Sequence, residues 1–222
     1  MGYKIGDKEI RYEFLMRNKD FFKSNIFVNE FGINSTNVVD LASFDFNKNV
    51  FYGFEIKSPR DNLDRLYKQL TSYITFFTFV YLIIADKHLD RGLEIIDNNR
   101  HLSKVGVISV TNDLKFQEVR QAKINKPFFD LFIRNLELDD LRMLCENKGF
   151  DPEGNKKQLI TSLKMHISME EIYEGLHKKL LRHHVHICPY CGSNLCYNKR
   201  KNGEESRTFC YECRNEIPVI ND

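Results

Sequence analysis

The sequence predicts an α/β protein in three parts: a mixed β-sheet flanked by helices, a small helical unit and a cysteine-containing end. Over the first 125 residues, apolar segments with strand periodicity alternate with amphipathic helical segments. The next segment carries leucines at helical spacing, and two Cys-x-x-Cys pairs follow it. We therefore expect three units, at residues 1–125, 126–182 and 183–222.

Length and composition set broad limits. The chain has 222 residues, of which 42% are hydrophobic and 29% charged, enough for one sizeable core and smaller modules. A net charge of +2 is too small to identify a partner. The start lacks an apolar leader, and the longest apolar stretch, 73–85, is too short to cross a bilayer. We expect a cytoplasmic protein that does not enter membranes.

The first unit is expected to run in the order α-β-β-β-α-β-α-β. Residues 8–22 show helical spacing, and residues 26–31 have the composition of a strand. Asn47-Lys48-Asn49 is typical of a turn between two strands at 37–46 and 49–57. Ser58, Pro59 and Asp61 favour the start of a helix whose apolar stripe continues to Phe77. The remaining elements are expected as a buried strand at 79–85, a helix at 91–98 and a strand at 105–110.

An acid-x-lysine sequence, Glu55-Ile56-Lys57, ends the third expected strand, fifteen residues after Asp40. Side chains alternate faces along a strand, so Glu55 and Lys57 share one face. Two carboxylates beside an ammonium suit a divalent cation held against a phosphate, because Mg²⁺ prefers oxygen ligands. We expect Asp40, Glu55 and the carbonyl of Ile56 to bind Mg²⁺ or Mn²⁺, and Lys57 to orient the attacking water.

The helix after this strand contributes further candidates. Gln69 lies beside its apolar stripe and could bind either the water or Lys57. Asp61 and Arg65 are four residues apart and are expected to pair, although Arg65 could instead reach a phosphate.

The site could contain a third carboxylate, and the candidates for it are Glu30, Glu9 and Glu13. An E-x-K sequence alone also occurs on ordinary solvated strand edges, and Glu30 could equally be a solvated residue at a strand end. The order of Asp40, the E-x-K sequence and Gln69 along the chain is what favours a catalytic site.

These segments resemble the PD-(D/E)XK nuclease superfamily, most closely its small bacterial and phage branch with the signature EIKS-x-x-D-x-x-x-R-L-x-x-Q. The resemblance covers about residues 8–112 and is carried by Val39-Asp40, Glu55-Ile56-Lys57-Ser58, Asp61-Asn62-Leu63-Asp64-Arg65-Leu66 and Gln69-Leu70-x-x-Tyr73. It implies a restriction-endonuclease-like core that cuts DNA with Mg²⁺ or Mn²⁺ in a bacterial or phage-infected cell. It makes Asp40 and Glu55 metal ligands, Lys57 the catalytic lysine and Gln69 its support. Glu30 would match the upstream glutamate. Val39 departs from the usual proline.

The middle unit resembles the SAP motif, a small helix-extended-helix DNA-binding module. The resemblance rests on Leu138-x-x-Leu141-Arg142, Gly149-Phe150 and Gly154-x-Lys156-x-x-Leu159-x-x-x-Leu163. It implies that backbone amides and lysines, here Lys156 and Lys157, contact DNA phosphates. The alternative is a helical linker that covers the first unit.

The cysteine pairs Cys188/Cys191 and Cys210/Cys213 supply four thiolates for tetrahedral Zn²⁺, and they resemble a zinc ribbon. Cys196 is interpreted as a small buried residue, with a substitute zinc ligand as the alternative. The histidines upstream of the pairs are interpreted as a basic linker, with metal binding as the alternative; they are His183, His184 and His186. The basic run Lys199-Arg200-Lys201 favours a nucleic-acid partner.

The sequence therefore predicts a metal-dependent DNA endonuclease or nickase with DNA-binding modules after the catalytic unit. The alternative is a catalytically inactive adaptor that keeps the nuclease fold and binds DNA or protein. A zinc-ribbon transcription factor would leave the first half of the chain unexplained. A homodimer is possible, and the preferred DNA structure stays open.

Overall fold

A six-stranded mixed sheet forms the centre of the computed structural model, which describes residues 5–22, 25–33, 37–183, 196–199, 207–210 and 212–217. The strands follow one another in the sheet in chain order. They are β1 (Ile26–Gly32), β2 (Val38–Asp45), β3 (Val50–Lys57), β4 (Phe79–Ala85), β5 (Gly106–Val110) and β6 (Phe116–Arg120). β1, β2 and β3 pair antiparallel, β3, β4 and β5 pair parallel, and β6 returns antiparallel. The carboxyl ends of β3, β4 and β5 therefore meet at one end of the sheet.

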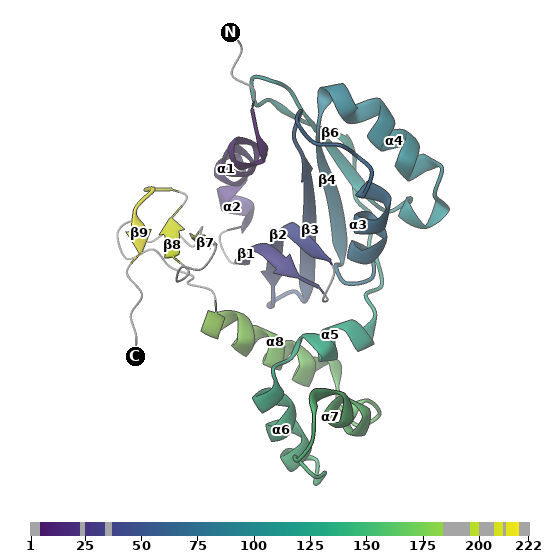
Figure 1. Cartoon of the computed structure of the whole chain (residues 1–222), viewed down its shortest axis with the longest axis vertical. Helices are drawn as coiled ribbons and strands as arrows, with labels where there is room; N and C mark the ends of the chain where they lie inside the picture. Colours follow the sequence, from purple (N-terminus) through teal and green to yellow (C-terminus); the bar gives the residue numbers. More distant parts are fainter. Residues whose placement is uncertain are drawn as a thin grey trace.

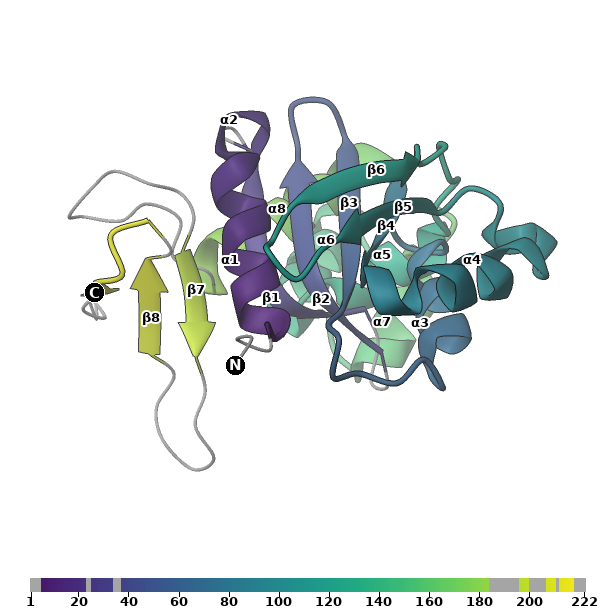
Figure 2. The ribbon, with the colours of Figure 1, turned by 90° about the horizontal axis from the view of Figure 1, so that it is seen from above.

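Helices cover both faces of the sheet. Figure 1 shows α1 and α2 on one face and α3 and α4 on the other, and in Figure 2 α1 again lies apart from α3 and α4. Their bounds are α1 (Asp7–Arg17), α2 (Lys19–Phe22), α3 (Leu66–Tyr73) and α4 (Leu89–Asp97). The predicted α/β class, with a mixed sheet flanked by helices, is confirmed.

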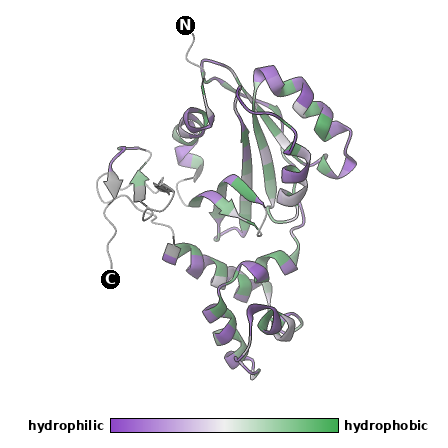
Figure 3. Ribbon diagram, in the orientation of Figure 1, coloured by the Kyte–Doolittle hydropathy of each residue, from purple (hydrophilic) through white to green (hydrophobic). Residues whose placement is uncertain are grey.

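Each face of the sheet has its own apolar cluster. Ile10 and Phe14 of α1 pack with Phe54 and Ile56 of β3 on one side. Leu66 and Leu70 of α3 belong to the larger cluster on the other side. In Figure 3 the strands are largely hydrophobic, while the helices carry both hydrophobic and hydrophilic residues. β4 consists almost entirely of apolar residues, most of them buried. This composition suits a central strand, because both of its faces are covered.

Four further helices lie beneath the sheet in Figure 1: α5 (Phe129–Asn135), α6 (Leu138–Asn147), α7 (Lys156–Leu163) and α8 (Met169–His183). Phe132 of α5 places its ring 4.7 Å from that of Phe76 and 5.7 Å from that of Phe51. The buried leucines of α6 and α7 belong to the same cluster. The core of the sheet is therefore continuous with that of these helices.

The helix after β3 starts later than the sequence predicts. Ser58 and Pro59 do not open it; α3 begins at Leu66. Asp61 instead accepts hydrogen bonds from the backbone N–H and the hydroxyl of Ser58, at 2.7 and 2.6 Å. A short polar side chain that binds nearby backbone competes with helix formation, which explains the turn.

Two other differences are local. The helix predicted over 8–22 is divided at Asn18, whose side-chain amide donates to the carbonyl of Phe14. β6 and α5 were not predicted, because β6 is largely exposed and α5 spans only seven residues.

The C-terminal part contains a small antiparallel sheet of β7 (Cys196–Lys199), β8 (Arg207–Cys210) and β9 (Glu216–Ile217). Cys196 of β7 lies opposite Cys210 of β8 in the antiparallel ladder. Several predicted residues lie outside the described part of the chain: Cys188, Cys191, His184, His186, Arg200 and Lys201. No helix in the described ranges has the length and apolar character needed to cross a membrane.

Candidate active site

Lys57 is the centre of the polar cluster at the end of β3. Its Nζ donates to Glu55 Oε1, two residues earlier on the same face, and to Gln69 Oε1 of α3 at 3.0 Å. Glu55 is completely buried and Lys57 is 8% exposed. The alternation of β3 and the position of α3 therefore bring together three residues that the sequence placed in one site.

Tyr73 holds the second oxygen of Glu55. Its hydroxyl donates to Glu55 Oε2 at 2.6 Å and lies 2.7 Å from the carbonyl oxygen of Val38. Burial, together with the Glu55 carboxylate, raises the pKa of Tyr73, so the hydroxyl remains a donor. Tyr73 is part of the segment that resembles the nuclease family, but no role was predicted for it. It lies one helical turn after Gln69, on the side of α3 that faces β3.

Asp40 lies where the β2–β3 ladder stops. Backbone pairing ends at Leu41 opposite Phe54, and the Asp40 carboxylate takes over by accepting from the N–H of Ile56 at 2.8 Å. Burial and the neighbouring Glu55 carboxylate raise the pKa of Asp40 from 3.8 to about 7. Burial is the larger cause, and the Glu55 carboxylate further disfavours the ionised form of Asp40.

Glu30 lies on β1 between residues that pair with Leu41 and Val39, which places it across from Asp40. It is exposed and adopts a φ of 53°, a left-handed conformation that side chains other than glycine rarely adopt. A strained backbone at such a position is typical of functional sites. Glu30 is therefore close to the cluster but does not enter its buried part.

The first helix contributes an acid that the sequence did not single out. Asp7 opens α1, and burial raises its pKa to about 6, with additional repulsion from Asp40, Asp61 and Glu30. Arg11, 7% exposed, donates to Asp7 at 2.9 Å. Asp7 therefore interacts electrostatically with these carboxylates, while its hydrogen-bond partner is Arg11. The four-residue spacing of Asp7 and Arg11 is the sequence signal from which their ion pair could have been predicted.

The two helical glutamates considered as rivals to Glu30 are engaged elsewhere. Glu9 accepts from the N–H of Gly6 at 2.9 Å and caps α1. Glu13 pairs with Arg17 at 2.7 Å. Arg65 precedes α3 and is exposed, and within the described residues no ion pair joins it to Asp61, which binds Ser58 instead. The expected Asp61–Arg65 pair is therefore wrong.

The cluster has oxygen donors suited to a divalent cation. Within the described residues, Asp40 Oδ1 accepts no hydrogen bond, while Oδ2 is used by Ile56. Asp40, Glu55 and the Ile56 carbonyl supply hard oxygen ligands, and Mg²⁺ commonly completes its shell with several waters. Among the residues that the structure describes, no group of three or more His, Cys, Asp or Glu side chains is placed so that it could hold a metal ion. Among these carboxylate oxygens Asp40 Oδ1 is open to a cation, whereas both oxygens of Glu55 already accept hydrogen bonds.

The other predicted contacts lie apart from this cluster. Lys156 and Lys157 open α7 and line a cavity of about 660 Å³ with Arg134 and Lys164. Burial lowers the pKa of Lys156. Lys199 ends β7.

Of the four predicted zinc ligands, the structure describes two. Cys210 is buried at the end of β8, and Cys213 is half-buried in the turn that follows. The turn brings the Arg214 N–H to the carbonyl oxygen of Cys210 at 3.0 Å.

Comparisons with known proteins complete the description. A family model described as bacteriophage P4 protein cII matches residues 8–186. A solved structure of a protein of unknown function from Silicibacter pomeroyi shares 16% identity, with a TM-score of 0.42; the match covers 66% of this chain and 92% of the other. The comparison with curated proteins gave no match.

Proposed function

The chain belongs to the family of bacteriophage P4 protein cII, and we propose that it is a metal-dependent DNA endonuclease. The observation that carries this proposal is the contact of Lys57 with both Glu55 and Gln69, beside Asp40. A binding protein has no need for a buried lysine and two repelling carboxylates at one strand end. Burying such groups costs free energy, which a catalytic role would explain.

In this proposal each side chain has a defined task. Asp40, Glu55 and the Ile56 carbonyl hold Mg²⁺ or Mn²⁺. When bound, the cation supplies positive charge beside the phosphate and lowers the pKa of a water. Lys57 orients that water and offsets charge that develops on the phosphate. Gln69 fixes the Lys57 ammonium, and Tyr73 fixes the Glu55 carboxylate.

The fold and the remaining modules are proposed to serve the same activity. The first unit is proposed to be restriction-endonuclease-like, the α6–α7 pair SAP-like and the C-terminal end a zinc ribbon. The cavity between α5 and α7 is lined by Lys156, Lys157 and Arg134, and by Lys164, which pairs with Asp130 at 2.7 Å; the excess of cations supports contact with DNA phosphates. Arg65 and the basic run at 199–201 are proposed to add further phosphate contacts. Weak contacts on linked modules reinforce one another through effective concentration.

The test is cleavage of supercoiled, linear and branched DNA by the purified chain with Mg²⁺ or Mn²⁺. We expect product with the unaltered protein and none with Asp40→Asn, Glu55→Gln or Lys57→Ala. Asp139→Asn, which changes an exposed acid on α6, is the matched control and keeps full activity. Cleavage that survives all three site substitutions would overturn the assignment. Gel filtration of the same samples tests the proposed homodimer.

One observation favours the alternative of an inactive DNA- or protein-binding adaptor. Both oxygens of the buried Glu55 already accept hydrogen bonds, from Lys57 and Tyr73. A cation must therefore displace or share these contacts. DNA binding without cleavage, under every metal tested, would support the adaptor.

A further inference from the structure

A pocket of about 470 Å³ lies at the carboxyl ends of β3, β4 and β5. Its floor is formed where these strands end, by Ala85 and Val110, which are 2% and 1% exposed. In parallel sheets, ligands commonly bind beyond the carboxyl ends of the strands. The volume is within the range of small-ligand sites.

The pocket adjoins the candidate active site. Its first two lining residues, Pro59 and Arg60, follow Lys57 and Ser58 directly in the chain. In the parallel ladders, Lys57 of β3 lies opposite Ile84 of β4, and Ala85 of β4 lies opposite Val110 of β5. The ends of the three strands therefore lie side by side. Two strand spacings, about 10 Å, separate β3 from β5. A nucleotide in the pocket would therefore adjoin a phosphate placed at Lys57.

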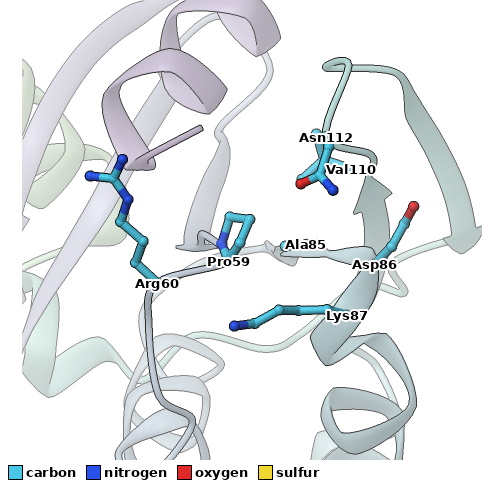
Figure 4. A pocket seen from close by; sticks show the side chains of 7 residues that line it. All are labelled: Pro59, Arg60, Ala85, Asp86, Lys87, Val110 and Asn112. Carbon is cyan, nitrogen blue, oxygen red and sulfur yellow. The ribbon is translucent and has the colours of Figure 1, made fainter. Parts of the chain in front are cut away.

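The chemistry of the lining differs from one side to the other. In Figure 4 the Lys87 side chain runs beneath Pro59 toward Arg60, so its ammonium lies on the β3 side. The Asn112 amide extends from the loop after β5, on the same side as Asp86. Cations thus lie nearest the candidate active site, and groups able to bind a base edge lie farther away.

We propose that this pocket binds one unpaired nucleotide of the DNA strand, next to the phosphodiester that is cut. Arg60 and Lys87 bind its phosphate, Pro59 and Val110 pack against the base, and Asn112 and Asp86 bind the base edge. A base can fill such a concavity only after leaving its stack and its pair, which costs least where it is already unpaired. The proposal rests on the proposed nuclease function and adds a substrate class: branched or flapped DNA.

The experiment measures binding of the full chain, in Ca²⁺ without Mg²⁺, to a DNA duplex with a single-stranded arm. A 2-aminopurine at the first unpaired nucleotide reports its environment by fluorescence, and a fully paired duplex of equal length is the reference. We expect roughly ten-fold tighter binding of the branched probe, with a fluorescence change on binding. Lys87→Gln and Asn112→Ala should each remove most of that preference.

Lys104→Gln is the matched control, because Lys104 is exposed and lies before β5, at the end of that strand away from the pocket. It should keep the preference. Equal affinity for the two probes, or equal effects of Lys87→Gln and Lys104→Gln, overturns the nucleotide pocket. Asp40→Asn separates the two proposals. If the unaltered chain cuts no DNA but both it and Asp40→Asn prefer the branched probe, the nuclease proposal fails and the pocket stands.

Discussion

Lys57 of β3 and Gln69 of α3 are joined by a hydrogen bond of 3.0 Å between Nζ and Oε1. This contact links the strand end to the helix that covers it. Together with Glu55, Gln69 restricts the ammonium to one position.

Gln69→Ala should lower the cleavage rate by roughly 10- to 100-fold, because residues that hold a catalytic group typically contribute that much. Gln69→Glu keeps an oxygen acceptor for Lys57 and should recover part of the rate. Single-turnover cleavage with Mn²⁺ measures both. Lys68→Ala, at the exposed neighbouring position, is the control and should be silent. If Gln69→Ala cleaves as fast as Lys68→Ala, the proposed support role is wrong.

Tyr73→Phe should destabilise the fold by about 1–3 kcal/mol, because it leaves a buried oxygen of Glu55 without its donor. The comparison is Tyr67→Phe on the same helix, where the residue is 41% exposed. Urea unfolding measures the free energy of unfolding of both variants. Equal stability of the two would show that the Tyr73–Glu55 contact contributes nothing to the folded state.

The free energy of unfolding should decrease as pH rises from about 4 to about 7 in the absence of Mg²⁺. The raised pKa of Asp40, about 7, means that the folded chain keeps a proton which the unfolded chain releases. The stability present at low pH is therefore lost as pH passes through the folded pKa, by on the order of 2–4 kcal/mol. Asp7, with a pKa raised to about 6, adds to the same decrease in the free energy of unfolding with rising pH.

Urea unfolding at several pH values tests this slope, and Asp40→Asn should flatten it. Asp139→Asn should leave it unchanged. A rise in stability over the same window would contradict the close approach of Asp40 and Glu55.

Zinc content should be about one ion per chain, because four thiolates complete a tetrahedral site. Cys188→Ser and Cys210→Ser should each release the metal and unfold the C-terminal module. Cys145→Ala is the control, since Cys145 lies in the helical core. Metal analysis of the purified variants gives the answer. Retention of zinc by Cys188→Ser would remove that residue from the proposed site, and loss by Cys196→Ser would add Cys196 to it.

Much of the sheet could be predicted because its signals are local. The period of two in β3 placed Glu55 and Lys57 on one face, and the continuous apolar run of β4 identified a central strand. The residues missed at the site depend on contacts between distant segments. Asp7 interacts electrostatically with the carboxylates only because α1 packs against β3, which no short window of sequence reports.

The start of α3 could not be found for a different reason. Ser58, Pro59 and Asp61 form a good helix-start pattern, yet the same Ser58–Asp61 pair also forms a closed turn, and the two outcomes use the same hydrogen-bonding groups. The turn leaves Pro59 and Arg60 at the end of the sheet. The deviation from the predicted helix is thus what gives the strand end its pocket.

Phe132 inserts between Phe51 and Phe76, so the helices after residue 126 complete the interior of the sheet. A shortened protein that stopped at Asn125 would present these rings to water and invite aggregation. The smallest fragment worth expressing for crystallisation or assays therefore extends through α8, whose Leu176 and Leu180 close the same interior.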